Sequence, residues 1–404
     1  MKALTKIGIG FLSLVAVALW FTSCSSEDVA SGTNQGKMSS LTLSINTGKS
    51  MGSRATAWDG TTTPTSTDEN TINRLTVGIF DASTKKVKTI VELTSATTGG
   101  NSLSVSGNTA TAKIVTTSLA TGDDVLVAAN APAGNFAGVA DETGFNAKTE
   151  GIEIAVLSSS DNTKEINTNI PMYGASTLNG SGSTFTATVS VQHQLAKITL
   201  DNLSVDFAQD GPYKSAKFTP TEFFVVNVPT SLAFSTAAID ATATHLHGFG
   251  TAYGISAASE WGAYKEYLAT GTLSGSALFG IANSGTEKYG SKSFFYVTPS
   301  TDVTSNGKMK LIIAGKFDAD GTGAAEETVF YPVAINATYD AAGNATAADG
   351  GTLFQVSPNK NYKCTVVIKT KGTTDPTKNL DPQTATVTVT VTDFVEASQT
   401  TTFE

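Results

Sequence analysis

The chain has 404 residues, which is enough for two or three domains that each bury a hydrophobic core. Charged residues make up only 15%, the net charge is −9, and long basic runs are absent, so we expect no nucleic-acid partner. Aliphatic residues mixed with many Thr, Ser and Gly favour strands and turns over long helices.

The first residues have the pattern of a secretory signal peptide. Lys2 and Lys6 flank the start of an apolar stretch, residues 7–21, that is too short for a membrane span. Small residues then lead into Cys24, as in a lipobox, whose cysteine thiol accepts diacylglycerol. We expect residues 1–23 to be removed and Cys24 to be lipidated. The alternative is an ordinary cleavage site beside an incidental cysteine.

A strand pattern follows at residues 39–46, where Leu41, Leu43 and Ile45 share one face. Beyond it lies a stretch of small residues that contains the Arg54–Ala55 bond, in a composition where proteases cut. No other arginine occurs between Cys24 and Arg74. We therefore expect residues 24–54 to form a propeptide that includes a removable first strand.

The body of the chain alternates apolar and polar side chains in short runs that turn residues separate. The clearest runs are Leu75-Val77-Ile79, Val87 to Leu93, Val125-Val127, Val189-Val191, Val329 to Ile335, and Tyr362-Cys364-Val366-Ile368. This pattern predicts an all-β fold with two β-sandwich domains, at residues 55–184 and 185–384. Trp261, Tyr264 and Leu268 are spaced for one short helix on a loop over residues 255–268.

The C-terminal segment, residues 385–404, repeats the chemistry of the first strand. Val387, Val389 and Val391 share one face, and an apolar tail follows. Its large members are Phe394, Val395 and Phe403. Either the valine run is the donor of a strand exchange, or it is the last strand of the second domain and residues 394–403 are the donor.

Whether one strand can replace the other depends on the free energy of burying each strand and on whether the strand is tethered. Each fully buried Val, Leu or Ile contributes roughly 1.5–3 kcal/mol, so the two segments stabilise a groove to a similar extent. A tethered strand competes at an effective concentration of about millimolar, and cleavage at Arg54 removes that advantage. The vacated edge then recruits a strand from another copy, head to tail. The alternative is that both segments are ordinary strands.

Several short blocks, in this order, resemble a known family. They are Val125 to Pro132, Ile170-Pro171-Met172-Tyr173-Gly174, Gln194 to Ile198, Phe295-Tyr296-Val297, Tyr331-Pro332-Val333, and Asn359 to Tyr362. Together they are similar to the FimA-type fimbrillins, the type V pilins of Gram-negative anaerobes. Gln194 stands where the family often has arginine, a departure that touches no expected function.

The resemblance implies an outer-membrane lipoprotein precursor with two transthyretin-like β-sandwich domains, assembled into an extracellular fimbrium that supports adhesion. It implies an arginine-specific protease acting at Arg54–Ala55, with Cys24 as the lipidated residue. Leu41, Leu43 and Ile45 match the departing strand, and residues 387–403 match the donor. Expected partners are further copies of the chain and accessory anchor and tip fimbrillins.

Chemistry beyond this is sparse. Three histidines are few for catalysis or metal binding: His245 and His247 have no third ligand nearby, and His193 shares a face with core residues. Asp318 to Gly321 fits a hairpin turn better than a calcium loop. Cys364 alternates with core residues. We expect no enzyme activity, cofactor or metal.

Three functions compete on these grounds. A polymerising shaft subunit needs a cleavable arginine and a C-terminal donor, and the chain has both. An anchor subunit of the same family should keep its lipid and lack the cleavable arginine, and a tip subunit should lack a usable donor strand or carry an extra binding module. A monomeric glycan-binding lipoprotein displays a flat array of exposed aromatic residues, whereas the three tryptophans here are scattered.

Overall fold

A computed structural model describes residues 38–393 of the chain, with gaps at 48–68, 108, 153–156, 159–160, 166–167, 236–238, 240–243, 256–258, 268–272, 275–280, 283–293, 341 and 380–384. The described residues form strands with very few helical turns, so the all-β prediction is confirmed. No described helix has the length and apolar character needed to cross a membrane.

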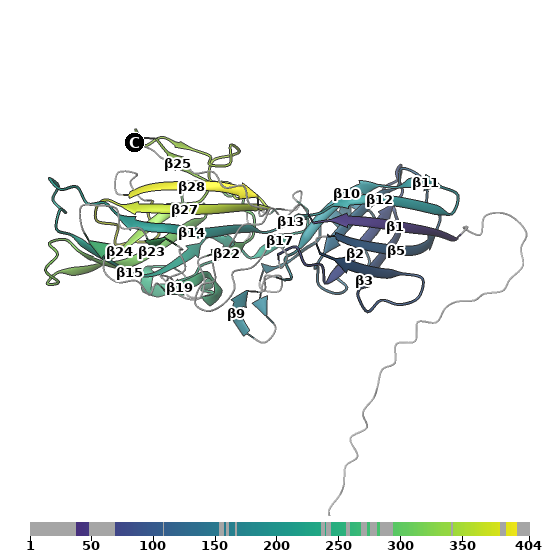
Figure 1. Ribbon diagram of the computed structural model, residues 1–404, viewed down its shortest axis with the longest axis horizontal. Coiled ribbons are helices and arrows are strands. Elements are labelled where there is room, and N and C mark those ends of the chain that lie inside the picture. Colours follow the sequence, from purple (N-terminus) through teal and green to yellow (C-terminus); the bar gives the residue numbers. More distant parts are fainter. Residues whose placement is uncertain are drawn as a thin grey trace, which may run out of the picture. The chain divides into compact units, whose positions relative to one another are not determined.

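The first sandwich consists of two five-stranded sheets (Figure 1). One sheet contains, in spatial order, β11 (Asn179–Ser181), β12 (Thr184–Ser190), β1 (Met38–Asn46), β5 (Thr109–Thr117) and β4 (Ser102–Ser106). The other contains β13 (Gln192–His193), β10 (Met172–Thr177), β6 (Asp124–Ala129), β2 (Arg74–Phe80) and β3 (Val87–Thr94). Alternate side chains from both sheets fill the core between them, as period-2 strands require.

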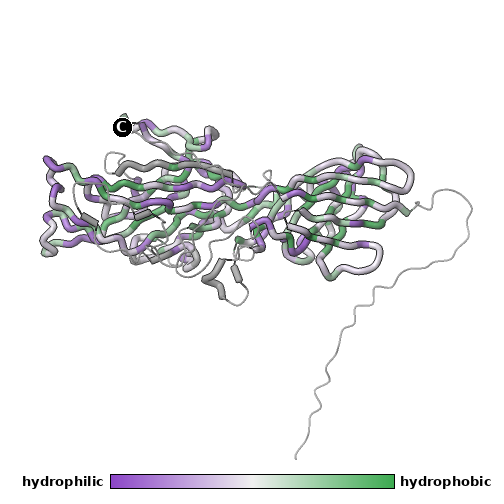
Figure 2. The backbone as a smooth tube through the Cα atoms, in the orientation of Figure 1, coloured by the Kyte–Doolittle hydropathy of each residue, from purple (hydrophilic) through white to green (hydrophobic). Residues whose placement is uncertain are grey.

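The second sandwich has the same two-layer construction. One sheet contains β21 (Ile281–Ala282), β14 (Ala196–Val205), β27 (Lys360–Ile368) and β28 (Ala385–Asp393), with β22 (Phe294–Val297) also paired to β14. The other contains β19 (Lys265–Tyr267), β15 (Lys217–Val226), β23 (Lys310–Asp318) and β24 (Glu326–Ala334), with β20 (Leu273–Ser274) also paired to β15. Figure 2 shows the hydrophobic and hydrophilic residues alternating along these strands.

Both sandwiches follow one strand plan, which indicates an internal duplication. In each, the first strand pairs in parallel with a late strand and antiparallel with an earlier one: β1 lies between β12 and β5, and β14 between β27 and β22. In each, the second strand of the sandwich begins the facing sheet and pairs antiparallel on both sides. Position β1 is therefore an integral place in the fold and not an appendage.

Short elements complete the described chain. Four two-stranded pairs are β16 (Val228–Pro229) with β18 (His245–Leu246), β17 (Ser231–Ala233) with β7 (Thr149–Gly151), β25 (Thr338–Tyr339) with β26 (Ala345–Thr346), and β8 (Leu157–Ser158) with β9 (Asp161–Glu165). The helical turns are α2 (Glu142–Asn146), η2 (Thr251–Tyr253) and η4 (Gly262–Tyr264). Asp141 caps α2 by accepting a hydrogen bond from the Gly144 backbone.

The helix predicted over residues 255–268 is wrong for the part of that range that the structure describes. Gly262–Tyr264 forms a single 3-10 turn, and the chain then enters β19. The rings of Trp261 and Tyr264 lie 4.5 Å apart between centroids. A spacing of three residues suits a 3-10 turn as well as an α-helix, which is why the pattern misled.

The domain boundary predicted between residues 184 and 185 falls inside the first sandwich. β12 begins at Thr184 and pairs with β1, and β13 pairs with β10 in the facing sheet. The second sandwich begins with β14 at Ala196. The small residues around Gly182 form the tight turn between β11 and β12, with Gly182 at φ 67°, rather than a linker.

Candidate functional site: the groove occupied by the first strand

Strand β1 lies in the interior of its sheet, hydrogen-bonded on both sides. It runs antiparallel to β5, from Met38 opposite Thr117 to Asn46 opposite Thr109. It runs parallel to β12, from Ser40 beside Thr184 to Asn46 beside Ser190. Removing β1 would therefore expose two unpaired edges and divide the sheet, rather than shorten it at one end.

The three apolar side chains predicted on β1 all enter the core. Leu41, Leu43 and Ile45 are completely buried. Leu41 lies between Ile114 and Phe185. Fully burying three such side chains stabilises the sandwich by about 5–9 kcal/mol, so β1 is a substantial part of its core.

The flanking residues give the groove a wide middle. Leu43 lies between Ala112 and Ala187, whereas Ile45 lies between Ala110 and Val189. Because alanine leaves room beside it, a large side chain at the middle position is needed to fill the space. Any strand that replaces β1 must present apolar residues at the same alternate spacing.

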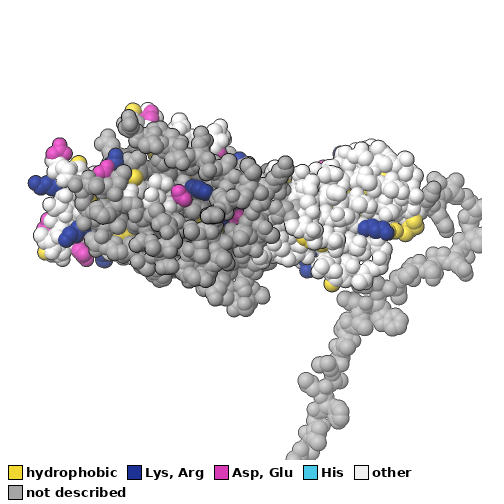
Figure 3. Space-filling view, viewed as in Figure 1, with side chains coloured by type: hydrophobic (Ala, Val, Ile, Leu, Met, Phe, Trp, Pro, Cys, Tyr) yellow, Lys and Arg dark blue, Asp and Glu magenta, His cyan; other side chains and the backbone are white. Residues whose placement is uncertain are grey.

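The outer face of the β1 sheet is polar but almost uncharged. Exposed positions on β1, β5 and β12 are mostly Ser and Thr. On the face shown in Figure 3, most side chains of the first sandwich are neither charged nor hydrophobic. β-branched Thr favours strands, and its hydroxyl keeps this face solvated.

Asn46, at the end of β1, and Glu69, where the described chain resumes, both form hydrogen bonds with the short segment 191–193. The Asn46 carbonyl accepts a hydrogen bond from the Val191 backbone at 2.9 Å. The Glu69 carbonyl lies 2.9 Å from Nε2 of His193, whose Nδ1 lies 3.1 Å from Oδ1 of Asn359. Val191 and His193 are two residues apart, so the chain that leaves β1 returns close to its point of departure.

Glu69 is held by a buried ion pair. Its Oε1 lies 2.8 Å from Nζ of Lys197 and accepts a hydrogen bond from the Tyr296 hydroxyl at 2.7 Å. The Lys197 ammonium also lies 4.3 Å from the centroid of the Phe294 ring. Breaking such a pair leaves a buried charge without a partner, which costs about 3–5 kcal/mol. Glu69 therefore fixes the chain immediately before β2 independently of β1.

The C-terminal valine run forms β28, the terminal strand of a sheet in the second sandwich. It pairs with β27 from Ala385 opposite Ile368 to Asp393 opposite Lys360. Val389 is buried in the second core. In this chain β28 thus has an intramolecular place, with Val387 and Val391 on the same alternate positions of the strand.

The remaining sequence-predicted site residues lie outside the described residues. These are Cys24, Arg54, Ala55, Phe394, Val395 and Phe403. Their assignments stay predictions.

His193, Cys364 and Asp318 each have contacts that explain them by the packing of the fold. Burial lowers the pKa of His193, which is hydrogen-bonded as described above. Burial raises the pKa of the Cys364 thiol, which is inert inside the second core. Asp318 accepts backbone hydrogen bonds from Gly321 and Gly323 in the turn from β23 to β24, as the hairpin prediction requires. Among the described residues, no group of three His, Cys, Asp or Glu side chains could hold a metal ion.

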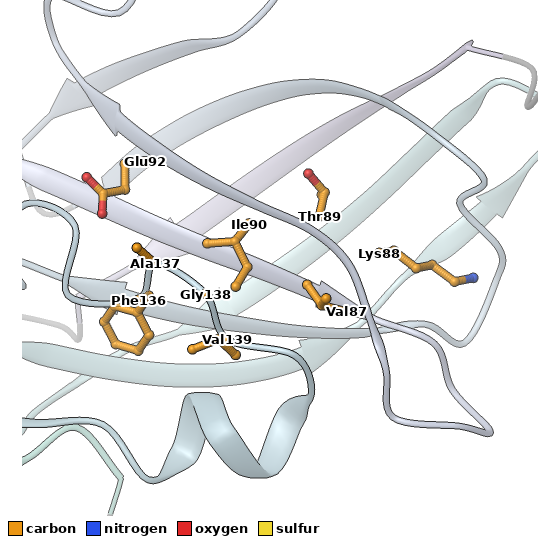
Figure 4. Close-up of a pocket in the computed structure, with 9 residues that line it drawn as sticks. All are labelled: Val87, Lys88, Thr89, Ile90, Glu92, Phe136, Ala137, Gly138 and Val139. Atoms are coloured by element: carbon orange, nitrogen blue, oxygen red, sulfur yellow. The ribbon is translucent and has the colours of Figure 1, made fainter. Parts of the chain in front are cut away.

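A hollow beside the edge strand β3 is shown in Figure 4. Phe136 and Val139 from the covering loop face Ile90 of β3 there. Its charged residues are already paired within the chain: Lys88 binds Asp123, and Glu92 accepts a hydrogen bond from the Gly134 backbone. The hollow is therefore accounted for by internal packing.

Comparisons with known proteins find similarity to a fimbrial subunit family over part of the chain and to solved structures over most of it. Residues 39–201 match the family model described as major fimbrial subunit protein (FimA), which confirms the resemblance expected from the sequence. The match spans the first sandwich, including β1. No protein with a curated function matches the chain.

Solved structures share the fold over most of the chain. A candidate cell adhesion protein from Bacteroides eggerthii is 21% identical, with 90% of this chain and 98% of that chain covered and a TM-score of 0.59. The fimbrilin FimA of Porphyromonas gingivalis is 19% identical, with 89% and 99% covered and a TM-score of 0.55. A candidate cell adhesion protein from Parabacteroides distasonis is 14% identical, with 89% and 99% covered and a TM-score of 0.58.

Proposed function

We propose that this chain is a structural subunit of a fimbrium and polymerises by exchanging β1 for the C-terminal segment of another copy. One observation carries the proposal: β1 fills the middle of a sheet with three completely buried side chains. Residues 47–68, which contain Arg54, are all that join it to the rest of the chain. A strand with this burial leaves only if its tether is cut and a replacement is at hand.

Proteolysis at Arg54–Ala55 is the proposed trigger. It separates β1 from the part of the chain that Glu69 fastens, so β1 can depart while β2 keeps its place. The equivalent strand of the second sandwich, β14, has no such release, because it continues directly from β13. Only the first sandwich is therefore equipped to become an acceptor.

The donor is the C-terminal segment 385–404 of a neighbouring copy. Two placements differ in cost. If β28 itself is the donor, it must first leave β27 and take Val389 out of the second core. If residues 394–403 are the donor, β28 stays in place, and eleven residues after Asp393 supply a strand comparable with the nine of β1.

The precursor would be exported as a lipoprotein through Cys24. An arginine-specific protease would then release the processed subunit, which would join anchor and tip subunits on the outer surface. Adhesion would be a property of the assembled fibre. The family match and the fold of the solved relatives support a structural protein rather than an enzyme.

The direct test substitutes Arg54→Ala in the producing cell, with Lys49→Ala as the matched control in the same segment. The proposal expects the Arg54 variant to remain a monomeric, lipid-anchored precursor, while the control forms SDS-resistant ladders. Ladders unchanged by Arg54→Ala would refute it. Mass spectrometry of shed fibres should find the subunit beginning at Ala55.

A tip or anchor subunit and a monomeric glycan-binding lipoprotein are the alternatives. A tip subunit would fail to donate its C-terminus, so truncation after Asp393 would leave its incorporation unchanged. A monomeric lipoprotein would stay monomeric with or without Arg54.

A further inference from the structure

The second sandwich contains a cavity of about 410 Å³ that plays no part in strand exchange. Four segments meet there, contributing Asn227 after β15, His247 after β18, Lys310 at the start of β23, and Thr377 before β28. Val226 and Ile255 add apolar walls. A cavity of this volume, with apolar walls and a few placed polar groups, lies in the range of small-molecule binding sites.

Lys310 places a positive charge in this cavity. The residue is 2% exposed, and among the described residues its ammonium donates one hydrogen bond, to the Thr377 carbonyl at 2.8 Å. The neighbouring charges are Lys308 and Asp375. The Asp375 carboxylate is occupied, because it accepts hydrogen bonds from the Thr377 backbone and hydroxyl at 2.9 and 2.6 Å. The ammonium keeps two donors for which the described chain supplies no acceptor.

His247 adds a neutral donor of defined orientation. Its Nδ1 accepts a hydrogen bond from the Asn227 backbone at 3.1 Å, so in the neutral ring the proton is on Nε2. Burial lowers the pKa of His247 to about 4, and the nearby His245 adds to this, so the ring is neutral at physiological pH.

The support around His247 is rigid. Asn227 has φ 64°, and its side-chain amide donates to the carbonyls of Asn306 and Lys308 at 2.7 and 2.9 Å. Asparagine tolerates this left-handed backbone conformation better than most residues, and the two hydrogen bonds fix it. A polar site held by such bonds is already organised before a ligand arrives.

We propose that this cavity binds a small carboxylate of sugar-acid size, with the Lys310 ammonium opposite its charge and Nε2–H of His247 as a second donor. One ammonium and one neutral donor match a single negative charge better than a dianion. None of the described residues that line the cavity is acidic. Burial lowers the pKa of Lys310 to about 8, a cost in stability that a bound anion would offset.

The test titrates the full chain with sodium glucuronate and N-acetylneuraminate, using neutral methyl glucoside as the matched ligand. Calorimetry and the ring signals of His247 by NMR report binding. We expect Lys310→Met to weaken binding by about tenfold or more, as expected when a buried charge partner is removed. Lys316→Met on the same strand, whose ammonium binds Thr328 outside the cavity, should leave affinity unchanged.

A second measurement uses the unaltered chain, in case Lys310→Met fails to fold. Affinity should fall by about tenfold between pH 7 and about pH 9.5, as Lys310 loses its proton while Asp375 and the ligand stay ionised. Three results would each overturn the proposal: no binding of either acid at millimolar concentration, equal binding of the neutral glycoside, or affinity independent of both Lys310 and pH.

Discussion

Leu43 occupies the part of the groove with the least support from its neighbours, since alanines flank it on both strands. Replacing Leu43 with Ala in an uncleavable Arg54→Ala chain should lower the free energy of unfolding of the first sandwich by about 2–5 kcal/mol. Denaturant unfolding measures this. Thr42→Ala, on the exposed face of the same strand, should change stability by less than about 0.5 kcal/mol.

The same two substitutions, made in the cleavable chain, separate a temporary strand from a permanent one. After cleavage and polymerisation β1 is absent, so Leu43→Ala should have no effect on the stability of the fibre. A fibre destabilised by Leu43→Ala would show that β1 stays in the assembled subunit.

The side chain of Glu150 is expected to make the folding stability depend on pH. Both of its carboxylate oxygens are buried and have no hydrogen-bond partner among the described residues, and burial raises the pKa from 4.5 to about 8. Because the folded pKa lies above the ordinary value, the folded state holds a proton that the unfolded state releases. The stabilising effect is therefore complete below pH 4.5 and is lost as the pH rises to about 8.

We expect the free energy of unfolding to fall by roughly 2–4 kcal/mol across this range through Glu150 alone. Glu150→Gln should remove most of that slope and make the protein more stable at pH 8. Thermal unfolding at several pH values compares the two chains. An identical slope in both would assign the pH dependence to other groups.

At the level of elements, β1, β2 and β27 were predictable because apolar and polar residues alternate over most of their length, whereas β6 and β24 contain continuous apolar runs. The facing sheets of a sandwich impose that period directly on the sequence. The turn at Gly182 was mistaken for a domain boundary because a tight hairpin and a linker use the same small residues.

The buried ion pair and hydrogen bond of Glu69 could not be predicted from sequence. Its partners, Lys197 and Tyr296, are more than a hundred residues away. No local period joins them, and a single Glu in a polar stretch resembles any solvated residue. Only the duplicated sandwich, which brings β14 and β22 together, creates the site.

If β1 leaves a vacant groove, an isolated β1 peptide should bind there. A synthetic peptide with the sequence of residues 38–47 should bind a chain that begins at Ala55 and block its polymerisation, because it can pair with both β5 and β12. The same peptide with Leu43→Lys should not bind, since a buried unpaired charge is costly. Size-exclusion chromatography with labelled peptides reports both outcomes. Equal inhibition by both peptides would rule out the groove as their site.

For the whole molecule, the duplicated strand plan is consistent with the proposed growth of a fibre from one chain. Both sandwiches place their first strand between a parallel and an antiparallel neighbour, but only the first sandwich can lose that strand by a cut outside its own sheets. In the proposed assembly, the acceptor groove lies in the first sandwich and the donor segment follows the second. Two different surfaces of one chain meet in each contact, which is the condition for open head-to-tail growth.

Cysteine cross-linking tests this arrangement and tells the two donor placements apart. Thr111 on β5 lies opposite Ser44 of β1, on the exposed face, so Thr111→Cys should form a disulfide with a donor residue that replaces Ser44. Combined with Thr390→Cys it should lock the fibre if β28 is the donor; combined with Thr400→Cys it should do so if residues 394–403 are. Covalent ladders in non-reducing gels would identify the pair in register. The buried Cys364 should not interfere. If neither pair cross-links fibres that form normally, neither residue 390 nor residue 400 lies opposite Thr111, which contradicts both donor placements as stated here.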